Sequence, residues 1–285
     1  MSLVKYEIAV SLNCECGETA EETLQNIKAA GFKSVMFSET DVTGELEDNI
    51  KTALALGLKI SNVHLGYSRE HNDLYHECEE RGIAFVKNTI RKLEIMGKYG
   101  IPVAVVHPVT ASNPRTPRPD ATSLRRMKEV VAAAERHNVK IALENLAVHD
   151  NEYLFFMLDN IDSELLGVCY DAGHANNYPP RVDMLKTYGH RLFALHLHDN
   201  YGDTESDFDY YKDHHFLPFD GTIDWEKLMR KIAATGYNGA IGMELHRANA
   251  VVQKYVHMPS LEFLKKAFKR GEKLHKLFVN YQESQ

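Results

Sequence analysis

A (β/α)8 TIM barrel of the α/β class is the fold that the sequence predicts, and three observations predict it. Eight short apolar runs, each typical of a strand buried on both faces, alternate with amphipathic stretches. The length of 285 residues suits one such barrel. The alternative, a doubly wound open sheet, lacks support because neither GxGxxG nor GxxxxGK[ST] occurs. We therefore expect a single barrel domain over residues 1–285.

The expected elements follow the apolar pattern along the chain. Strands are predicted at 6–12, 33–38, 58–65, 101–107, 139–144, 165–171, 191–198 and 239–244. Helical patterns lie near 18–30, 45–56, 72–99, 120–137, 151–160, 181–188, 224–235 and 259–281. Glycines before several strands are expected to end the preceding helices, namely Gly31, Gly57, Gly100, Gly167 and Gly236.

The composition limits the classes of function. A formal net charge of -7 and a pI near 6.1 lack the basic excess of a protein that binds a phosphate backbone, so nucleic acid is not an expected partner. No apolar run reaches the ~18 residues of a membrane span, and no secretory signal begins the chain. The four cysteines are too few and scattered for a disulfide framework. We expect a cytoplasmic protein, and assembly into a homo-oligomer stays open.

Four side chains of types that bind metal ions stand at the ends of four predicted strands. They are Glu144 in KIALEN, Asp171 in GVCYDAGH, His196 in LFALHLHDN and Glu244 in GAIGMELH. In a parallel barrel such strand ends meet at one rim. Three carboxylates there would repel one another unless a cation joined them. The sequence therefore predicts a site for one divalent metal ion, and the ligand types suit Mn²⁺, Zn²⁺, Co²⁺ or Mg²⁺.

Any one of these side chains, taken alone, is more often a solvated loop residue or a helix cap. Their recurrence on four strand ends favours the metal site.

Further candidates stand in the loops of the same rim. Contacts to a substrate are expected from His64, His107, His174, His214 and Arg247. Packing within the core or the loops is the alternative for these histidines.

The motifs around these residues resemble the xylose isomerase-like superfamily of sugar isomerases and epimerases. The most telling are LENL, YDAGHANN, LHLHDN and GMELH, and the resemblance runs from about Ile8 to the last helix. In that superfamily a Glu, an Asp, a His and a second Glu from successive strands bind one divalent ion. The resemblance implies this role for Glu144, Asp171, His196 and Glu244. It favours His196 over His198, because the superfamily pattern at that strand is the ligand His, an apolar residue, any residue and then Asp or Glu. The residues from His196 to Asp199 fit this pattern.

The resemblance implies a sugar or sugar-phosphate isomerase or epimerase that depends on a divalent metal. Such an enzyme abstracts a proton next to a carbonyl through a metal-stabilised enediolate, with Glu144 and Glu244 as the acid–base pair. An inosose dehydratase-like lyase, which begins with the same proton abstraction, is one alternative. A sugar-binding barrel without catalysis is another.

The same superfamily contains the endonuclease IV enzymes, which are phosphodiesterases that use three zinc ions. Their extra ligands lie on histidines after two strands, on a DxxH histidine and in a D-x-H-H loop. The corresponding residues here are His64, His107, His174 and His214. Two positions before His214 stands Lys212, and Asp213 falls out of register, so additional zinc stays an open expectation.

Overall fold

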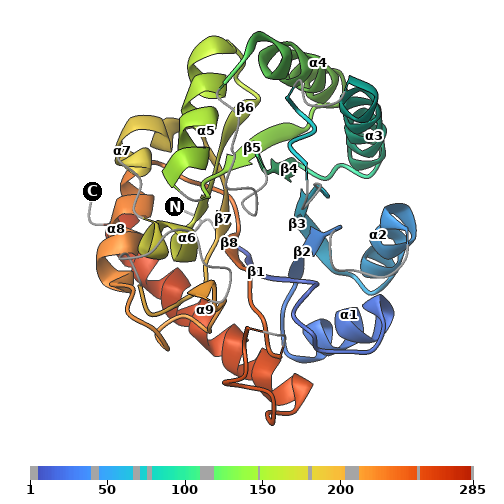
Figure 1. The fold of residues 1–285 in the computed structure, drawn as a ribbon. Helices are drawn as coiled ribbons and strands as arrows, with labels where there is room; N and C mark the ends of the chain where they lie inside the picture. The colour runs from blue at the N-terminus through green and yellow to red at the C-terminus, as the bar shows by residue number, and fades with distance from the viewer. Residues whose placement is uncertain are drawn as a thin grey trace.

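The computed structural model describes residues 6–39, 45–66, 71–75, 79–109, 119–146, 148–178, 182–202, 212–248 and 251–283. Most of the long loop expected after the fourth strand, 110–118, lies outside these residues. Figure 1 shows the strands gathered in the centre with the helices around them. The molecule is an eight-stranded parallel TIM barrel of one domain, as the sequence predicts.

The sheet runs in the order β7-β6-β5-β4-β3-β2-β1-β8, and each strand pairs in parallel with its neighbours in this order. Between β7 and β8, the amide of Leu197 donates to the carbonyl of Gly242 at 2.9 Å, which nearly closes the barrel. The strands are β1 (Ile8–Ser11), β2 (Ser34–Ser38), β3 (Lys59–His64), β4 (Val103–Val106), β5 (Lys140–Glu144), β6 (Leu166–Asp171), β7 (Leu192–His196) and β8 (Ile241–Met243).

Helices connect the strands on the outside of the barrel. They are α1 (Ala20–Ala29), α2 (Leu46–Ala55), α3 (Glu79–Lys98), α4 (Ala121–His137), α5 (Val148–Asn160), α6 (Ala172–Asn177), α7 (Met184–Tyr188), the 3-10 turn η1 (Gly189–Arg191), α8 (Trp225–Ala234) and α9 (Ser260–Gln282). None of the helices in the described residues is long and apolar enough to cross a membrane.

The glycine prediction is confirmed at four positions and wrong at one. Gly31, Gly57, Gly100 and Gly236 have positive φ values, which favour glycine where a helix ends. Gly167 instead lies within β6, where a Cβ would come within 2.1 Å of the Arg191 carbonyl oxygen. Close approach of two backbones, not a helix end, accounts for this glycine.

The interior of the barrel positions the rim. Along β5, Ile141 and Leu143 pack into the large core beneath the helices, so Lys140, Ala142 and Glu144 face the barrel axis. A second, small core fills the interior below the rim and consists of Val103, Val105, Ala142, Cys169 and Ala194. Because these side chains are small and close-packed, they fix the strand ends just above them.

Candidate metal centre

The sequence-predicted ligands lie together at the carboxyl end of the barrel. Ligand atoms of one group, which we call the central group, all lie within 4.8 Å of one another. Nδ1 of His196 is 3.3 Å from Oε1 of Glu144 and 3.0 Å from Oε2 of Glu244. The central group consists of Glu144, Asp171, His196 and Glu244. The structure thus brings together all four residues that the strand ends predict.

A second group, the β3–β4 group, consists of His64, His107 and the same Glu144. Nε2 of His64 and Nε2 of His107 lie 3.0 and 3.2 Å from Oε2 of Glu144. The other oxygen of this carboxylate, Oε1, faces His196 in the central group. Glu144 is therefore shared, with one oxygen directed to each group, as in carboxylates that bridge two metal ions.

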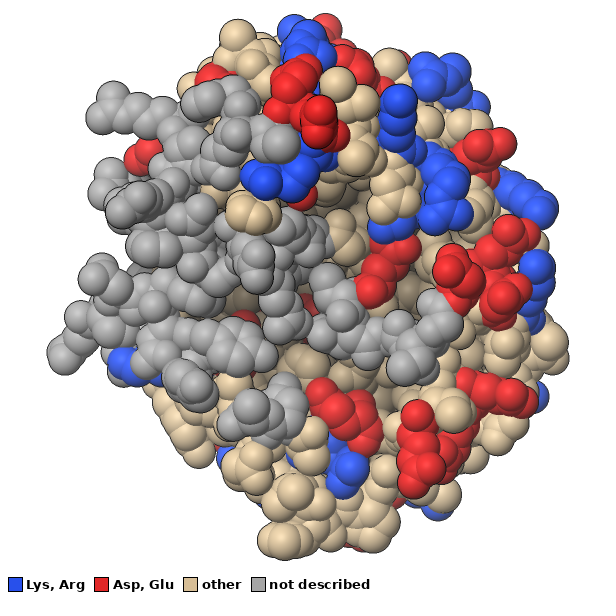
Figure 2. Space-filling model, turned by 45° about the vertical axis from the view of Figure 1, so that its right-hand side comes forward, with Lys and Arg blue, Asp and Glu red and all other residues tan. Residues whose placement is uncertain are grey.

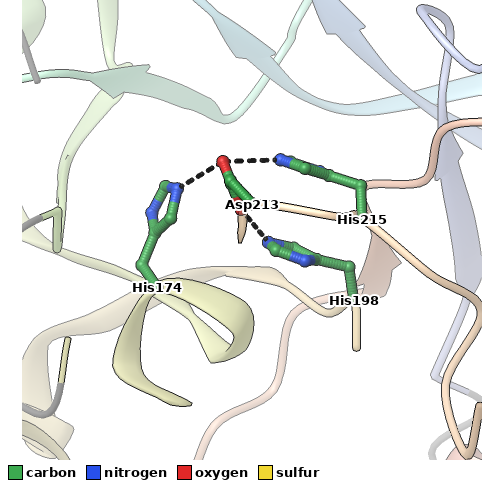
Figure 3. Close-up of side chains that lie close together, drawn as sticks. All are labelled: His174, His198, Asp213 and His215. Atoms are coloured by element: carbon green, nitrogen blue, oxygen red, sulfur yellow. Dashed lines mark hydrogen bonds and ion pairs between the residues drawn. The ribbon is translucent and has the colours of Figure 1, made fainter. Parts of the chain in front are cut away.

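A third group, the Asp213 group, lies beside the central group and is drawn in Figure 3. Oδ2 of Asp213 lies 3.3 Å from Nε2 of His174 and 3.1 Å from Nε2 of His215. Its Oδ1 lies 3.9 Å from Nε2 of His198. The group consists of His174, His198, Asp213 and His215, which come from α6, from the end of β7 and from the segment before α8.

The Asp213 group corrects the register that the sequence suggested. Aligning the D-x-H-H pattern on His214 puts Lys212 at the position of the Asp. In the structure the pair is instead Asp213 and His215, which are two positions apart and in contact. The ring of His214 instead stacks on Phe216, with centroids 4.7 Å apart, and lies outside the three groups. A loop has no periodicity, so the sequence alone could not decide which of two adjacent histidines faces inward.

Arg247 also stands apart from the three groups. Its guanidinium donates through Nε to the carbonyl of Glu15 at 2.9 Å and through NH1 to the carbonyl of Met258 at 3.1 Å. The carboxylate of Glu15 accepts from the amide of Arg247 and lies 2.5 Å from Nδ1 of His246. Arg247 and His246 thus join the loop after β8 to the turn after β1.

Backbone carbonyls orient three of the imidazole rings for binding through Nε2. Nδ1 of His64 lies 3.1 Å from the carbonyl of Leu65, and Nδ1 of His215 lies 3.1 Å from that of Glu244. Nδ1 of His174 lies 2.9 Å from the carbonyl of Asn145. A carbonyl only accepts, so each Nδ1 carries a proton. Nε2 is then the atom that can bind a metal, once the proton that it shares with a neighbouring carboxylate has left, and this is the arrangement of metal-binding histidines.

Asn145 holds two parts of the centre in place, although the sequence pattern did not single it out. Its Nδ2 donates to the carbonyl of Asp171 at 2.9 Å, and its Oδ1 accepts from the amide of Asp171 at 2.8 Å. Asp171 in turn caps α6, because Oδ1 accepts from the amide of His174 at 2.6 Å. The position of Asn145 directly after a strand-end Glu was the signal that could have found it.

Without a cation, protons and histidines balance the buried carboxylates. Burial would lower the pKa of His174, but the charges of Asp171 and Asp213 outweigh it and raise this pKa well above its usual value. Burial would likewise lower the pKa of His215, but Asp213 raises it to about 9. Burial opposes ionisation of Glu144, yet His196 and His107 hold its pKa well below the usual range. Divalent ions would replace these protons.

Comparisons with known proteins agree with this geometry. The sequence profile of the family described as xylose isomerase-like TIM barrel matches residues 24–267. The chain belongs to this family. It is 32% identical over 263 residues to the uncharacterized protein y4fM of Sinorhizobium fredii, a match that covers 80% of this chain and 81% of y4fM.

Solved structures share the fold at low identity. D-psicose 3-epimerase from Clostridium cellulolyticum H10 superposes with a TM-score of 0.74 at 16% identity, covering 94% of this chain and 99% of that one. The IolI protein, solved with a bound zinc atom, gives a TM-score of 0.71 at 14% identity over 96% and 99% of the two chains. Epimerases and isomerases thus share this fold.

Proposed function

We propose that this chain is a hydrolase of small phosphate esters that uses two or three divalent ions. The shared carboxylate of Glu144 carries the proposal, because its two oxygens face two separate groups of ligands. Two metal ions about 3.5–4 Å apart are the usual arrangement in enzymes that cleave phosphate esters. An acid–base role would require this carboxylate to have a free oxygen, and here both oxygens have imidazole partners.

The charge of the centre supports an anionic substrate. Its carboxylates are Glu144, Asp171, Asp213 and Glu244, and its histidines bind metal in their neutral form. Three divalent ions would leave an excess of two positive charges, which attracts a phosphate group. A single divalent ion would leave an excess of negative charge, which repels one.

The chain's own residues suit this reaction in distinct ways. When bound, the metal ions would activate a water molecule and neutralise charge on the phosphate. The ring of His64 is held by a backbone carbonyl, so its Nε2 stays directed at Glu144 in the β3–β4 group. The side chains of Asp213 and Glu244 are 11% and 12% exposed, whereas that of Glu144 is 1% exposed. We assign Glu244 to face the substrate and hold a proton during the reaction.

The surface argues for a small substrate rather than DNA. The chain has a formal net charge of -7. On the described part of the face in Figure 2, basic and acidic side chains are interspersed. A nucleic-acid groove needs an excess of basic side chains along the phosphate backbone. A sugar phosphate or a related small ester fits this surface better.

Metal counting and an ester assay test the proposal together. The purified protein is equilibrated with Zn²⁺ or Mn²⁺, its ions are counted by elemental analysis, and release of phosphate or nitrophenol is followed with sugar phosphates and nitrophenyl phosphates. We expect two or three ions per chain and ester cleavage that stops when a chelator removes them. One ion per chain with no cleavage of any ester would contradict the proposal.

A divalent-metal-dependent sugar isomerase or epimerase is the second candidate, and a lyase of the inosose dehydratase type would begin with the same proton transfer. The central group favours it, since Glu144 and Glu244 both lie beside Nδ1 of His196, where one ion would hold the two carboxylates together. Structural neighbours such as D-psicose 3-epimerase support the same chemistry. Exchange of substrate C–H hydrogen with deuterated solvent, lost in Glu244→Gln, would select this candidate over ester hydrolysis.

A further inference from the structure

We propose that His198 is a positioning residue that couples the central group to the Asp213 group, so that ion binding at one depends on the other. This proposal rests on the multinuclear centre proposed above, although not on the reaction. His198 is a member of the Asp213 group, where its ring stacks on His215 and its Nε2 lies 3.9 Å from Oδ1 of Asp213. The same ring also reaches a ligand of the central group through its Nε2 edge.

The first contact is a hydrogen bond to a ligand of the central group. Nε2 of His198 lies 3.0 Å from Oδ1 and 3.1 Å from Oδ2 of Asp171, and both side chains are completely buried. Because the carboxylate only accepts, Nε2 carries the proton and donates it. Nδ1 is buried and has no hydrogen-bond partner among the described residues. The Nδ1 atoms of His64, His174 and His215 each face a backbone carbonyl that holds a proton there, whereas Nδ1 of His198 does not. The proton of the neutral His198 ring therefore stays on Nε2, and His198 orients Asp171 instead of binding a metal through that atom.

The second contact is a stacked ring in the Asp213 group. The rings of His198 and His215 lie 3.8 Å apart at an angle of 8° (Figure 3). His215 is also held at Nδ1 by the carbonyl of Glu244, which follows β8. Stacking on one side and a hydrogen bond at one edge leave the His215 ring a single orientation, with Nε2 directed at Asp213.

A glycine makes room for this ring. A Cβ on Gly173 would lie 1.9 Å from Cε1 of His198, so a larger residue would displace the imidazole. The carbonyl of Gly173 accepts from Nδ2 of Asn200 at 2.8 Å, which prevents the first turn of α6 from moving aside. The fold thus fixes His198 between Asp171 and His215, and a shift of either ligand is transmitted through one rigid ring.

Two substitutions separate the two contacts. His198→Phe keeps a flat ring that stacks on His215 but removes the donor to Asp171; His198→Gln keeps a donor but removes the ring. Residues that orient metal ligands typically change metal affinity by about 10- to 100-fold. We expect His198→Phe to weaken ion binding in the central group, and His198→Gln to weaken it mainly in the Asp213 group.

The experiment measures Zn²⁺ and Co²⁺ binding to the full chain with competing chelators, without substrate, and repeats each titration in the His215→Ala background. Visible spectra of bound Co²⁺ report the coordination at each step. In the parent protein, His215→Ala is expected to weaken ion binding in the central group as well. In a protein that also carries His198→Phe, this effect of His215→Ala on the central group should disappear. The proposal would be overturned if the effects of the His198 and His215 substitutions on ion affinity were additive, or if His198→Phe and His198→Gln both left the ion affinities unchanged.

Matched controls come from the neighbouring histidine. His214→Phe and His214→Gln make the same chemical changes at a ring that lies outside the three groups. We expect parental ion binding from both, and an equal loss from these controls would also overturn the coupling. Far-UV circular dichroism checks the fold. If His198→Phe unfolds, His198→Gln still tests the stacking contact, and if His198→Gln unfolds, His198→Phe still tests the hydrogen bond to Asp171. The two proposals can fail separately. Ester cleavage without coupled ion binding would contradict the role of His198 alone, and coupled ion binding without ester cleavage would contradict the hydrolase function alone.

Discussion

The rim of the barrel has two unlike sides. From β3 to β8 the strand ends and the loops after them carry the ten ligand candidates of the three groups, and the two remaining ends, at β1 and β2, carry none among the described residues. Asn13 and Ser38, which are buried and uncharged, follow or end those two strands. The difference teaches that the centre is one-sided, and a substrate that approached the ions from the β1–β2 side would displace no ligand of the three groups.

The largest expected effect comes from breaking the side rich in ligands at its shared carboxylate. Glu144→Gln keeps the shape of the side chain but removes the charge that both the central and the β3–β4 groups use. We expect loss of at least one ion per chain and a fall in turnover of about 10³-fold or more. Elemental analysis and initial rates measure both. A Gln variant with the full ion count would show that Glu144 is not shared.

The Asp213 group should have a smaller effect, because Asp213 and His215 are on loops rather than strand ends. His215→Ala removes one ligand and leaves Asp213 with His174. We expect the loss of one ion and a fall in turnover of about 10- to 100-fold, with the barrel still folded. Turnover at the parental rate with one ion fewer would assign the third ion a structural role.

The stability of the ion-free protein should depend on pH through the ligand-rich side. The folded pKa of His215 is about 9 and its ordinary value is 6.5, so its contribution is fully present below pH 6.5 and is lost as the pH rises toward 9. The loss is on the order of 3 kcal/mol. Urea unfolding at several pH values measures it. With Zn²⁺ bound the decline should vanish, and a decline that persists would contradict exchange of protons for ions.

The β1–β2 side should give the smallest effect, and one on binding of substrate alone. Oδ1 of Asn13 is buried and has no hydrogen-bond partner among the described residues. Because a buried acceptor without a donor is costly, we expect it to accept from a hydroxyl of the bound substrate. We expect Asn13→Ala to raise KM by about 2- to 10-fold, the value of one neutral hydrogen bond, with kcat and ion count unchanged. A change in ion count would place Asn13 on the metal side of the comparison.

The sequence predicted strand-borne features well and loop-borne features poorly. Each of the eight strands lies within its expected range, because each short apolar run marks one strand that is buried on both faces. The position of Glu144, Asp171, His196 and Glu244 at the ends of these runs allowed them to be placed on one rim. The helix α6 was not predicted, since its six residues are too few and too polar for a period to emerge.

Sharing of ligands was beyond the sequence for a different reason. Spacing along the chain indicates that His64 and Glu144 are on the same rim, but not that Oε1 and Oε2 of one carboxylate face different partners. The pairing of Asp213 with His215 depends likewise on the path of a connection between β7 and α8. Such pairings are set by distances of a few ångströms in three dimensions, which no pattern of residue types specifies.

The carbonyl contacts at Nδ1 of His64, His174 and His215 have a consequence for how the centre fills. Rings anchored to the main chain before any ion arrives do not need to search for their orientation. A zinc finger gains its architecture from the metal; here the architecture comes first. Chelation should therefore leave an intact barrel, and reloading should proceed at the pace of ion encounter and proton release, with no refolding step.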